Sequence, residues 1–89
     1  MLMTKERKEI LLGFGHHESD LPQLERAMNG RVTHYTLNGK RISRQKAIDL
    51  LGEKVWLSGI SRSAFHWTAS RPIGNTNEYV CFDSSALFR

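Results

Sequence analysis

Cysteine, proline and long apolar runs are all scarce in this chain of 89 residues. Cys81 is the single cysteine and cannot form an internal disulfide, so the fold does not depend on an oxidising compartment. The N-terminus lacks the apolar core of a signal peptide, and no stretch approaches the roughly 20 apolar residues that a membrane helix requires. With two prolines and no biased tract, a long disordered linker is excluded as well. We therefore expect a folded, cytoplasmic protein.

Acidic residues are scarce in the centre of the chain. Residues 31–71 contain eight lysines and arginines but only Asp49 and Glu53, a net charge of +6, whereas residues 1–30 and 72–89 each carry a net charge of −1. Such an imbalance attracts phosphate groups, acidic protein surfaces or anionic lipid headgroups, without selecting among them. The central segment is therefore the first place to look for a binding site.

The local patterns predict one small α+β domain over residues 1–89, with an antiparallel sheet of β-hairpins packed against three to four short helices. Residues 1–30 form its helical part, with helices over residues 4–12 and between Asp20 and Gly30. Residues 31–89 are expected to contain a hairpin, a central helix and a C-terminal hairpin. The first hairpin turns at Asn38-Gly39, a dipeptide that favours tight turns, and Ser43 caps the central helix over residues 44–51.

Residues 57–63, LSGISRS, resemble the turn and the start of the recognition helix in the helix-turn-helix family. The resemblance implies that Gly59 forms the turn, that Ile60 is buried, and that Arg62 and Ser63 face DNA. The resemblance covers a small part of the chain. The helical segment that begins at residue 53 is then expected to end at Gly59.

Residues 64–70 show a competing pattern. Phe65, Trp67 and Ala69 alternate with His66, Thr68 and Ser70, which is the period of a strand. Residues 78–83, EYVCFD, supply a β-rich partner beyond a loop at Pro72. We therefore favour a strand over residues 64–70, and we expect the aromatic residues of both segments, with Trp56, to form much of the core.

Four cations, Lys40, Arg41, Arg44 and Lys46, fall within seven residues. Clusters of this kind bind phosphates by charge and counterion release, and serine and threonine hydroxyls add positioning hydrogen bonds. On a strand over residues 64–70, Arg62 and His66 would share a face with Thr68 and Ser70, and His34 with Thr36 would extend that face. The predicted nucleic-acid-binding residues are Lys40, Arg41, Arg44, Lys46, Arg62 and His66.

Other chemistry is poorly supported. His16 and His17 are adjacent, and neither they nor the other histidines show the spacing of metal ligands, so no metal or cofactor is expected. Cys81, His66 and an acid such as Asp83 or Asp49 are the residue types of a nucleophilic set. A lone cysteine in an apolar strand is nevertheless typical of a small buried side chain, so we predict no enzymatic activity.

The sequence therefore predicts a non-enzymatic cytoplasmic protein, of bacterial or phage origin, that binds nucleic acid or another polyanion through its central segment. The alternative is a protein-interaction module, either a homodimer or an inhibitor of a partner protein, anchored by aromatic residues and arginine. Binding driven by charge weakens steeply as salt rises, whereas an apolar interface persists. No membrane contact and no small-molecule substrate are expected.

Overall fold

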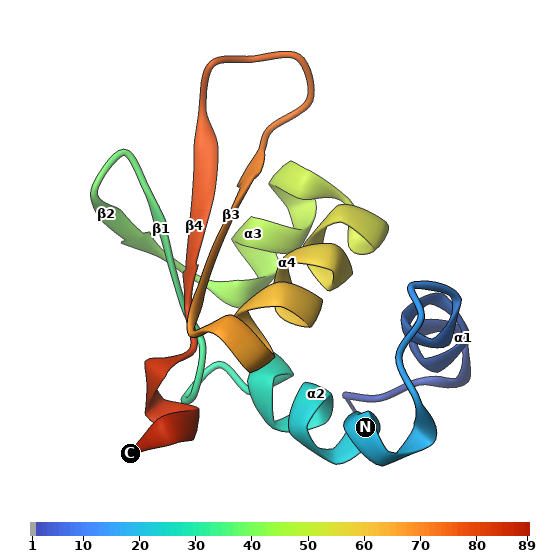
Figure 1. Cartoon of the computed structure of the whole chain (residues 1–89). Coiled ribbons are helices and arrows are strands. Elements are labelled where there is room, and N and C mark those ends of the chain that lie inside the picture. Colours follow the sequence, from blue (N-terminus) through green and yellow to red (C-terminus); the bar gives the residue numbers. More distant parts are fainter. Residues whose placement is uncertain (1) are drawn as a thin grey trace.

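The computed structural model describes residues 2–89, which form an α+β domain as predicted. The elements are α1 (Lys5–Gly13), η1 (Glu18–Asp20), α2 (Leu21–Met28), β1 (His34–Leu37), β2 (Lys40–Ile42), α3 (Arg44–Leu51), α4 (Glu53–His66), β3 (Thr68–Pro72), β4 (Tyr79–Asp83) and η2 (Ser85–Phe88). The strands form one antiparallel sheet in the order β2-β1-β4-β3. The four α-helices lie on one side of this sheet (Figure 1).

Local signals in the sequence explain several element boundaries. Asn38 and Gly39 have φ angles of 53° and 80°, the left-handed conformation that a tight two-residue hairpin turn requires. The Ser43 side chain accepts a hydrogen bond from the Lys46 backbone N–H at 3.1 Å and so caps α3. Gly52, with a φ of 86°, ends α3 and allows α4 to begin at the next residue.

Residues 53–66 form one continuous helix, so two predictions for this segment are wrong. Gly59 is not a turn, and the strand begins at Thr68 rather than at residue 64. A Cβ atom on Gly59 would lie 2.3–2.7 Å from three ring atoms of Phe82. The glycine is needed because α4 packs directly on the aromatic ring of β4, a close approach that only a residue without a side chain permits.

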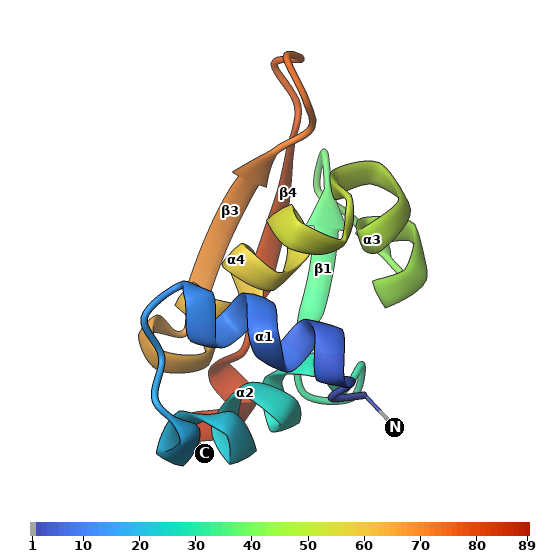
Figure 2. The same ribbon diagram turned by 90° about the vertical axis from the view of Figure 1, so that its right-hand side faces the viewer.

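Helix α4 is the centre of the core. It packs against the sheet, α1, α2 and α3, and Figure 2 shows α1 crossing in front of α4 with the sheet behind it. Trp56 is fully buried and donates a hydrogen bond from Nε1 to the Tyr35 hydroxyl at 3.0 Å. The prediction that aromatic residues form the core is correct for Trp56 and Phe82. It is wrong for Phe65, Trp67 and Tyr79, which are 36%, 58% and 52% exposed.

The chain reverses abruptly between α4 and β3. Trp67 has a φ of 72°, a conformation that bulky residues rarely adopt, and its carbonyl accepts a hydrogen bond from the Ser84 N–H at 2.7 Å. Beyond β3, the connection of residues 73–78 projects away from the helices (Figures 1 and 2). Within residues 2–89, no helix is long and apolar enough to cross a membrane.

Candidate nucleic-acid interface

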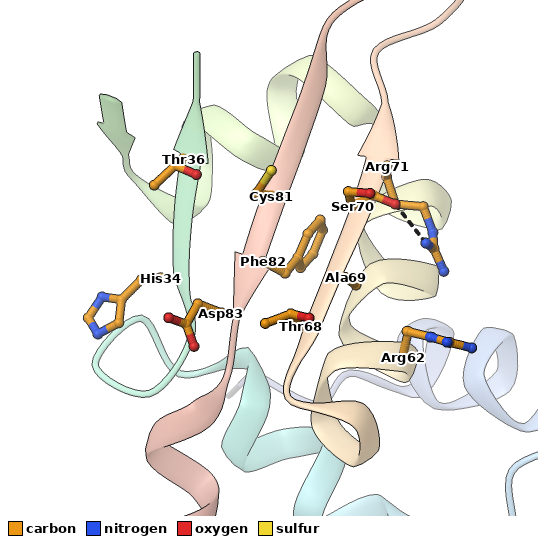
Figure 3. A pocket seen from close by; sticks show the side chains of 10 residues that line it. All are labelled: His34, Thr36, Arg62, Thr68, Ala69, Ser70, Arg71, Cys81, Phe82 and Asp83. Atoms are coloured by element: carbon orange, nitrogen blue, oxygen red, sulfur yellow. Dashed lines mark hydrogen bonds between the residues drawn. The ribbon is translucent and has the colours of Figure 1, made fainter. Parts of the chain in front are cut away.

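One face of the sheet carries polar side chains and is not covered by the helices. Alternation along the strands buries Tyr35, Val80 and Phe82 against the helices and turns their neighbours outward. The register aligns one outward row across all four strands, consisting of Arg41, Thr36, Cys81 and Ser70. A second row contains His34, Asp83 and Thr68. Figure 3 shows the members of both rows that lie on β1, β4 and β3, namely His34, Thr36, Thr68, Ser70, Cys81 and Asp83.

Three hollows lie on this side of the molecule and around the edge of the sheet. The largest, here the sheet hollow, has a volume of 740 Å³ and is lined by His34, Thr36, Arg62, Thr68, Ala69, Ser70, Arg71, Cys81, Phe82 and Asp83. The α4 groove, of 500 Å³, is lined by Phe14, His16, Asp20, Ser58, Ser61, Arg62, Phe65, His66 and Arg71. The corner hollow, of 280 Å³, is lined by Gly30, Thr33, His34, Tyr35, Arg41, Ile42, Ser43 and Arg44.

The three hollows are connected through shared side chains. His34 lines both the corner hollow and the sheet hollow, and Arg62 and Arg71 line both the sheet hollow and the α4 groove. We call this continuous surface the basic band. It runs from Arg41 and Arg44 at one end, across the hydroxyl groups of the sheet, to Arg62 and Arg71 at the other.

Arg71 is held in place by its neighbours. Its Nε donates to the Ser58 hydroxyl at 2.9 Å, its Nη2 to the Ser58 carbonyl at 3.2 Å, and its Nη1 to the Ser70 carbonyl at 2.8 Å. Arg62 is exposed and has no hydrogen-bond or ion-pair partner among residues 2–89. One guanidinium group is thus held by hydrogen bonds and the other has all its donors free, and both can donate to an anionic ligand.

The cations of the central segment are not neutralised within the protein. The ion pairs among residues 2–89 join Arg7 with Glu53, Lys8 with Glu18, and His16 with Asp20, so no lysine or arginine between residues 31 and 71 takes part. Their charge is therefore available to an external anion.

Two acidic residues lie within the band, Asp20 in the α4 groove and Asp83 in the sheet hollow. Asp83 accepts a hydrogen bond from the Ser85 backbone N–H at 3.0 Å, and hydrogen bonds from Ser85 together with the nearby His34 lower the pKa of this carboxyl. Asp83 therefore stays ionised at neutral pH. Its negative charge opposes an anion at the centre of the sheet and leaves the two arginine-rich ends as the favoured contacts.

Comparison with known proteins yields no match to a family model, to a curated protein or to a solved structure. The function must be argued from the residues themselves.

The structure places the predicted residues in two groups. Arg41 and Arg44 line the corner hollow, with Arg44 donating to the Met28 carbonyl at 2.8 Å, and the exposed Lys40 and Lys46 lie beside them in the chain without lining a hollow. Arg62 and His66 lie on α4, so the expectation that they share a strand face with Thr68 and Ser70 is wrong. The basic band nevertheless joins the two groups through His34 and Arg71.

Other sequence interpretations need correction. Ser63, which the helix-turn-helix resemblance directed towards DNA, is fully buried. Cys81 is exposed rather than buried, and it lines the sheet hollow with Asp83, whereas His66 lines the α4 groove. No nucleophilic set of Cys81 and His66 is therefore formed.

Two functional candidates escaped the sequence interpretation. Arg71 was counted among the cations, but its place beside Ser58 depends on a contact across 13 residues. His16 was considered only as a metal ligand, yet its Nε2 contacts the Ser61 hydroxyl, 45 residues away. No local pattern in the sequence signals either contact.

Proposed function

We propose that this protein binds nucleic acid through its phosphate backbone, along the basic band. The observation that carries the proposal is the position of Arg62 and Arg71. Both line two adjoining hollows, and neither is neutralised by a carboxylate of residues 2–89. Arginine at a fixed position can contact phosphate with two parallel hydrogen bonds, which makes it the preferred residue for this recognition.

The composition of the band favours backbone contacts over base readout. Arginines, histidines and hydroxyl groups line it, and these side chains position phosphate and sugar groups without reading sequence. Among the exposed aromatic residues, Trp67 and Tyr79 line none of the three hollows, whereas Phe14 and Phe65 line the α4 groove, where they could stack on bases of any sequence. We therefore expect binding that tolerates many sequences.

Packing around α4 supports the same conclusion. The exposed residues of this helix are Glu53, Lys54, Val55, Arg62, Phe65 and His66, and Ser58 and Ser61 are half-buried. The helix α1 packs alongside, as the ion pair between Arg7 and Glu53 illustrates. A recognition helix must enter the major groove, which is about 12 Å wide, whereas α4 is packed between α1, α2, α3 and the sheet.

The test is fluorescence anisotropy with labelled single-stranded and double-stranded oligonucleotides of mixed sequence at increasing salt. Each phosphate contact contributes about −0.9 to the slope of log K against log salt for duplex and about −0.7 for single strands. If Arg62 and Arg71 each contact one phosphate, R62A/R71A reduces the slope by about 1.8 on duplex or about 1.4 on single strands.

The matched control is K5A/R26A, which removes the same charge from exposed positions outside the band. The proposal is supported if the slope of log K against log salt becomes smaller in R62A/R71A and stays unchanged in K5A/R26A. A quadruple alanine variant of Lys40, Arg41, Arg44 and Lys46 then tests the corner end of the band. Absence of binding by the wild-type protein at low salt, or equal losses in both double variants, contradicts the proposal.

A second candidate function is supported by an exposed aromatic pair. Trp67 and Phe88 are 58% and 44% exposed, and their ring centroids lie 5.7 Å apart. Large apolar side chains gathered on a surface are typical anchors of protein partners. A partner or second copy that binds at this pair would do so with little dependence on salt. W67S would weaken that binding, whereas R62A/R71A would not.

Cytoplasmic location remains a prediction from the sequence.

A further inference from the structure

Three side chains from two parts of the chain form a hydrogen-bonded series in the wall of the α4 groove, His16 and Asp20 from before α2 and Ser61 from α4. The His16 Nε2 atom forms a hydrogen bond with the Ser61 hydroxyl, and His16 Nδ1 lies 3.3 Å from Asp20 Oδ2. Asp20 also accepts a hydrogen bond from the His17 backbone N–H at 3.1 Å. A hydroxyl, an imidazole and a carboxylate are thus connected in the order used by nucleophilic serine sites.

The charge on Asp20 determines which nitrogen of His16 carries the proton. The hydrogen bond from His17 and the neighbouring imidazole lower the pKa of the Asp20 carboxyl, so it is ionised at neutral pH. An ionised carboxylate accepts hydrogen bonds only, and Nδ1 of His16 must therefore be the donor. In the neutral imidazole this leaves the lone pair on Nε2 to accept the Ser61 O–H, which is the arrangement of a general base.

The surroundings of Ser61 suit a small ester. The rings of His16 and Phe65 are stacked, with centroids 5.7 Å apart, so the imidazole is fixed by contacts on its edge and on its face. Ser61 is half-buried and opens into the groove, where Phe14 and Phe65 offer apolar surface. The guanidinium groups of Arg62 and Arg71 line the same groove and can stabilise negative charge on a carbonyl oxygen.

The geometry points to Ser61 as a nucleophile for acyl transfer, with His16 as its general base and Asp20 as the residue that orients His16. As the Ser61 oxygen bonds to the carbonyl carbon of an ester, its proton passes to His16 Nε2. Collapse of the tetrahedral intermediate breaks the bond to the alcohol, which leaves with that proton. Water, activated by His16 in the same way, releases the carboxylic acid and restores the Ser61 hydroxyl.

This inference does not depend on nucleic-acid binding, and it opposes the prediction from the sequence that the protein is not an enzyme. The competing explanation is that the hydrogen bond between His16 and Ser61 has a structural role only and holds the connection between α1 and α2 against α4. The two explanations differ in a measurable property. If the hydrogen bond is only structural, removing it changes the stability of the protein and nothing else. An activated Ser61 hydroxyl, in contrast, reacts covalently with electrophiles.

The experiment treats the full-length protein with a fluorophosphonate probe, whose phosphorus bonds to an activated serine oxygen as fluoride leaves. Peptide mass spectrometry then locates and quantifies the modified residue. Labelling is expected at Ser61 and is expected to be slowed at least about 100-fold by H16Q, the scale of general-base catalysis. D20N is expected to slow labelling too, because an amide can favour the other tautomer of His16.

The matched control is S19A, which removes an exposed serine hydroxyl that does not line the α4 groove. It should label at Ser61 like the wild type. Circular dichroism and thermal melting establish that each variant is folded, and D20N, at a half-buried carboxyl, provides the test if H16Q does not fold. Labelling of Ser61 no faster than that of the exposed Ser19, or labelling unchanged in folded H16Q or D20N, overturns the proposal.

Discussion

The substitution G59A tests whether the glycine in α4 is required by packing on the sheet. In an isolated helix, alanine is favoured over glycine by about 1 kcal/mol. In this fold the added methyl group would lie 2.3–2.7 Å from three atoms of the Phe82 ring, well inside contact distance. That ring is 1% exposed and packs against Tyr35 with centroids 5.2 Å apart, so it has little room to move.

Overpacking of a filled core costs about 1–3 kcal/mol, and the three close contacts place G59A towards the upper end of that range. After the gain in helix propensity, the free energy of unfolding should fall by about 2 kcal/mol, which lowers Tm by roughly 8–16 °C in a domain of this size. Urea titration and thermal melting followed by circular dichroism measure both quantities.

Two further variants identify the cause of the loss. G13A adds a methyl group that meets no atom within 4 Å, so its stability should be unchanged or slightly higher. In an F82L background, where the ring is absent, G59A should lower the free energy of unfolding by less than about 1 kcal/mol, because positions 59 and 82 are energetically coupled. A G59A protein as stable as the wild type would refute the packing argument.

Two other predictions concern polar groups. S84A should lower the free energy of unfolding by about 1–3 kcal/mol in urea titrations, because the buried Ser84 hydroxyl bonds to Thr33 at 2.6 Å and to Ser63 at 2.9 Å; a neutral result would contradict this. The folded-state pKa values of Asp20 and Asp83 lie below 3.8, so their stabilisation is present above that pH and is lost as pH falls through the folded values. D20N/D83N should therefore lose less stability than the wild type in acid melts.

Much of the fold could be predicted because short segments determined it. Asn38-Gly39 specified the first hairpin, and Ser43 and Gly52 marked the start and end of α3. Gly59 misled the interpretation because the sequence does not distinguish a glycine that turns the chain from one that admits a neighbouring ring. The reason for Gly59 is Phe82, which lies 23 residues further along the chain.

The candidate site was predicted only in part, for the same physical reason. Charge is a property of the sequence, so Arg41, Arg44 and Arg62 could be identified from composition alone. The contacts that place Arg71 beside Ser58 join elements that meet only in the folded molecule. The chain likewise reverses at Trp67, which has a positive φ. Such a reversal is usually predicted from a glycine, and none is present at this position.

The central claim is that nucleic acid lies along the basic band, and amide chemical-shift mapping by NMR tests it most directly. An oligonucleotide titrated into ¹⁵N-labelled protein at low salt should shift the amides around Arg62 and Arg71 and those of the corner hollow near Arg41. Shifts confined to α2, or to the surface around Trp67 and Phe88, would contradict the claim. Absence of any shift would leave the positive charge of residues 31–71 without a nucleic-acid role.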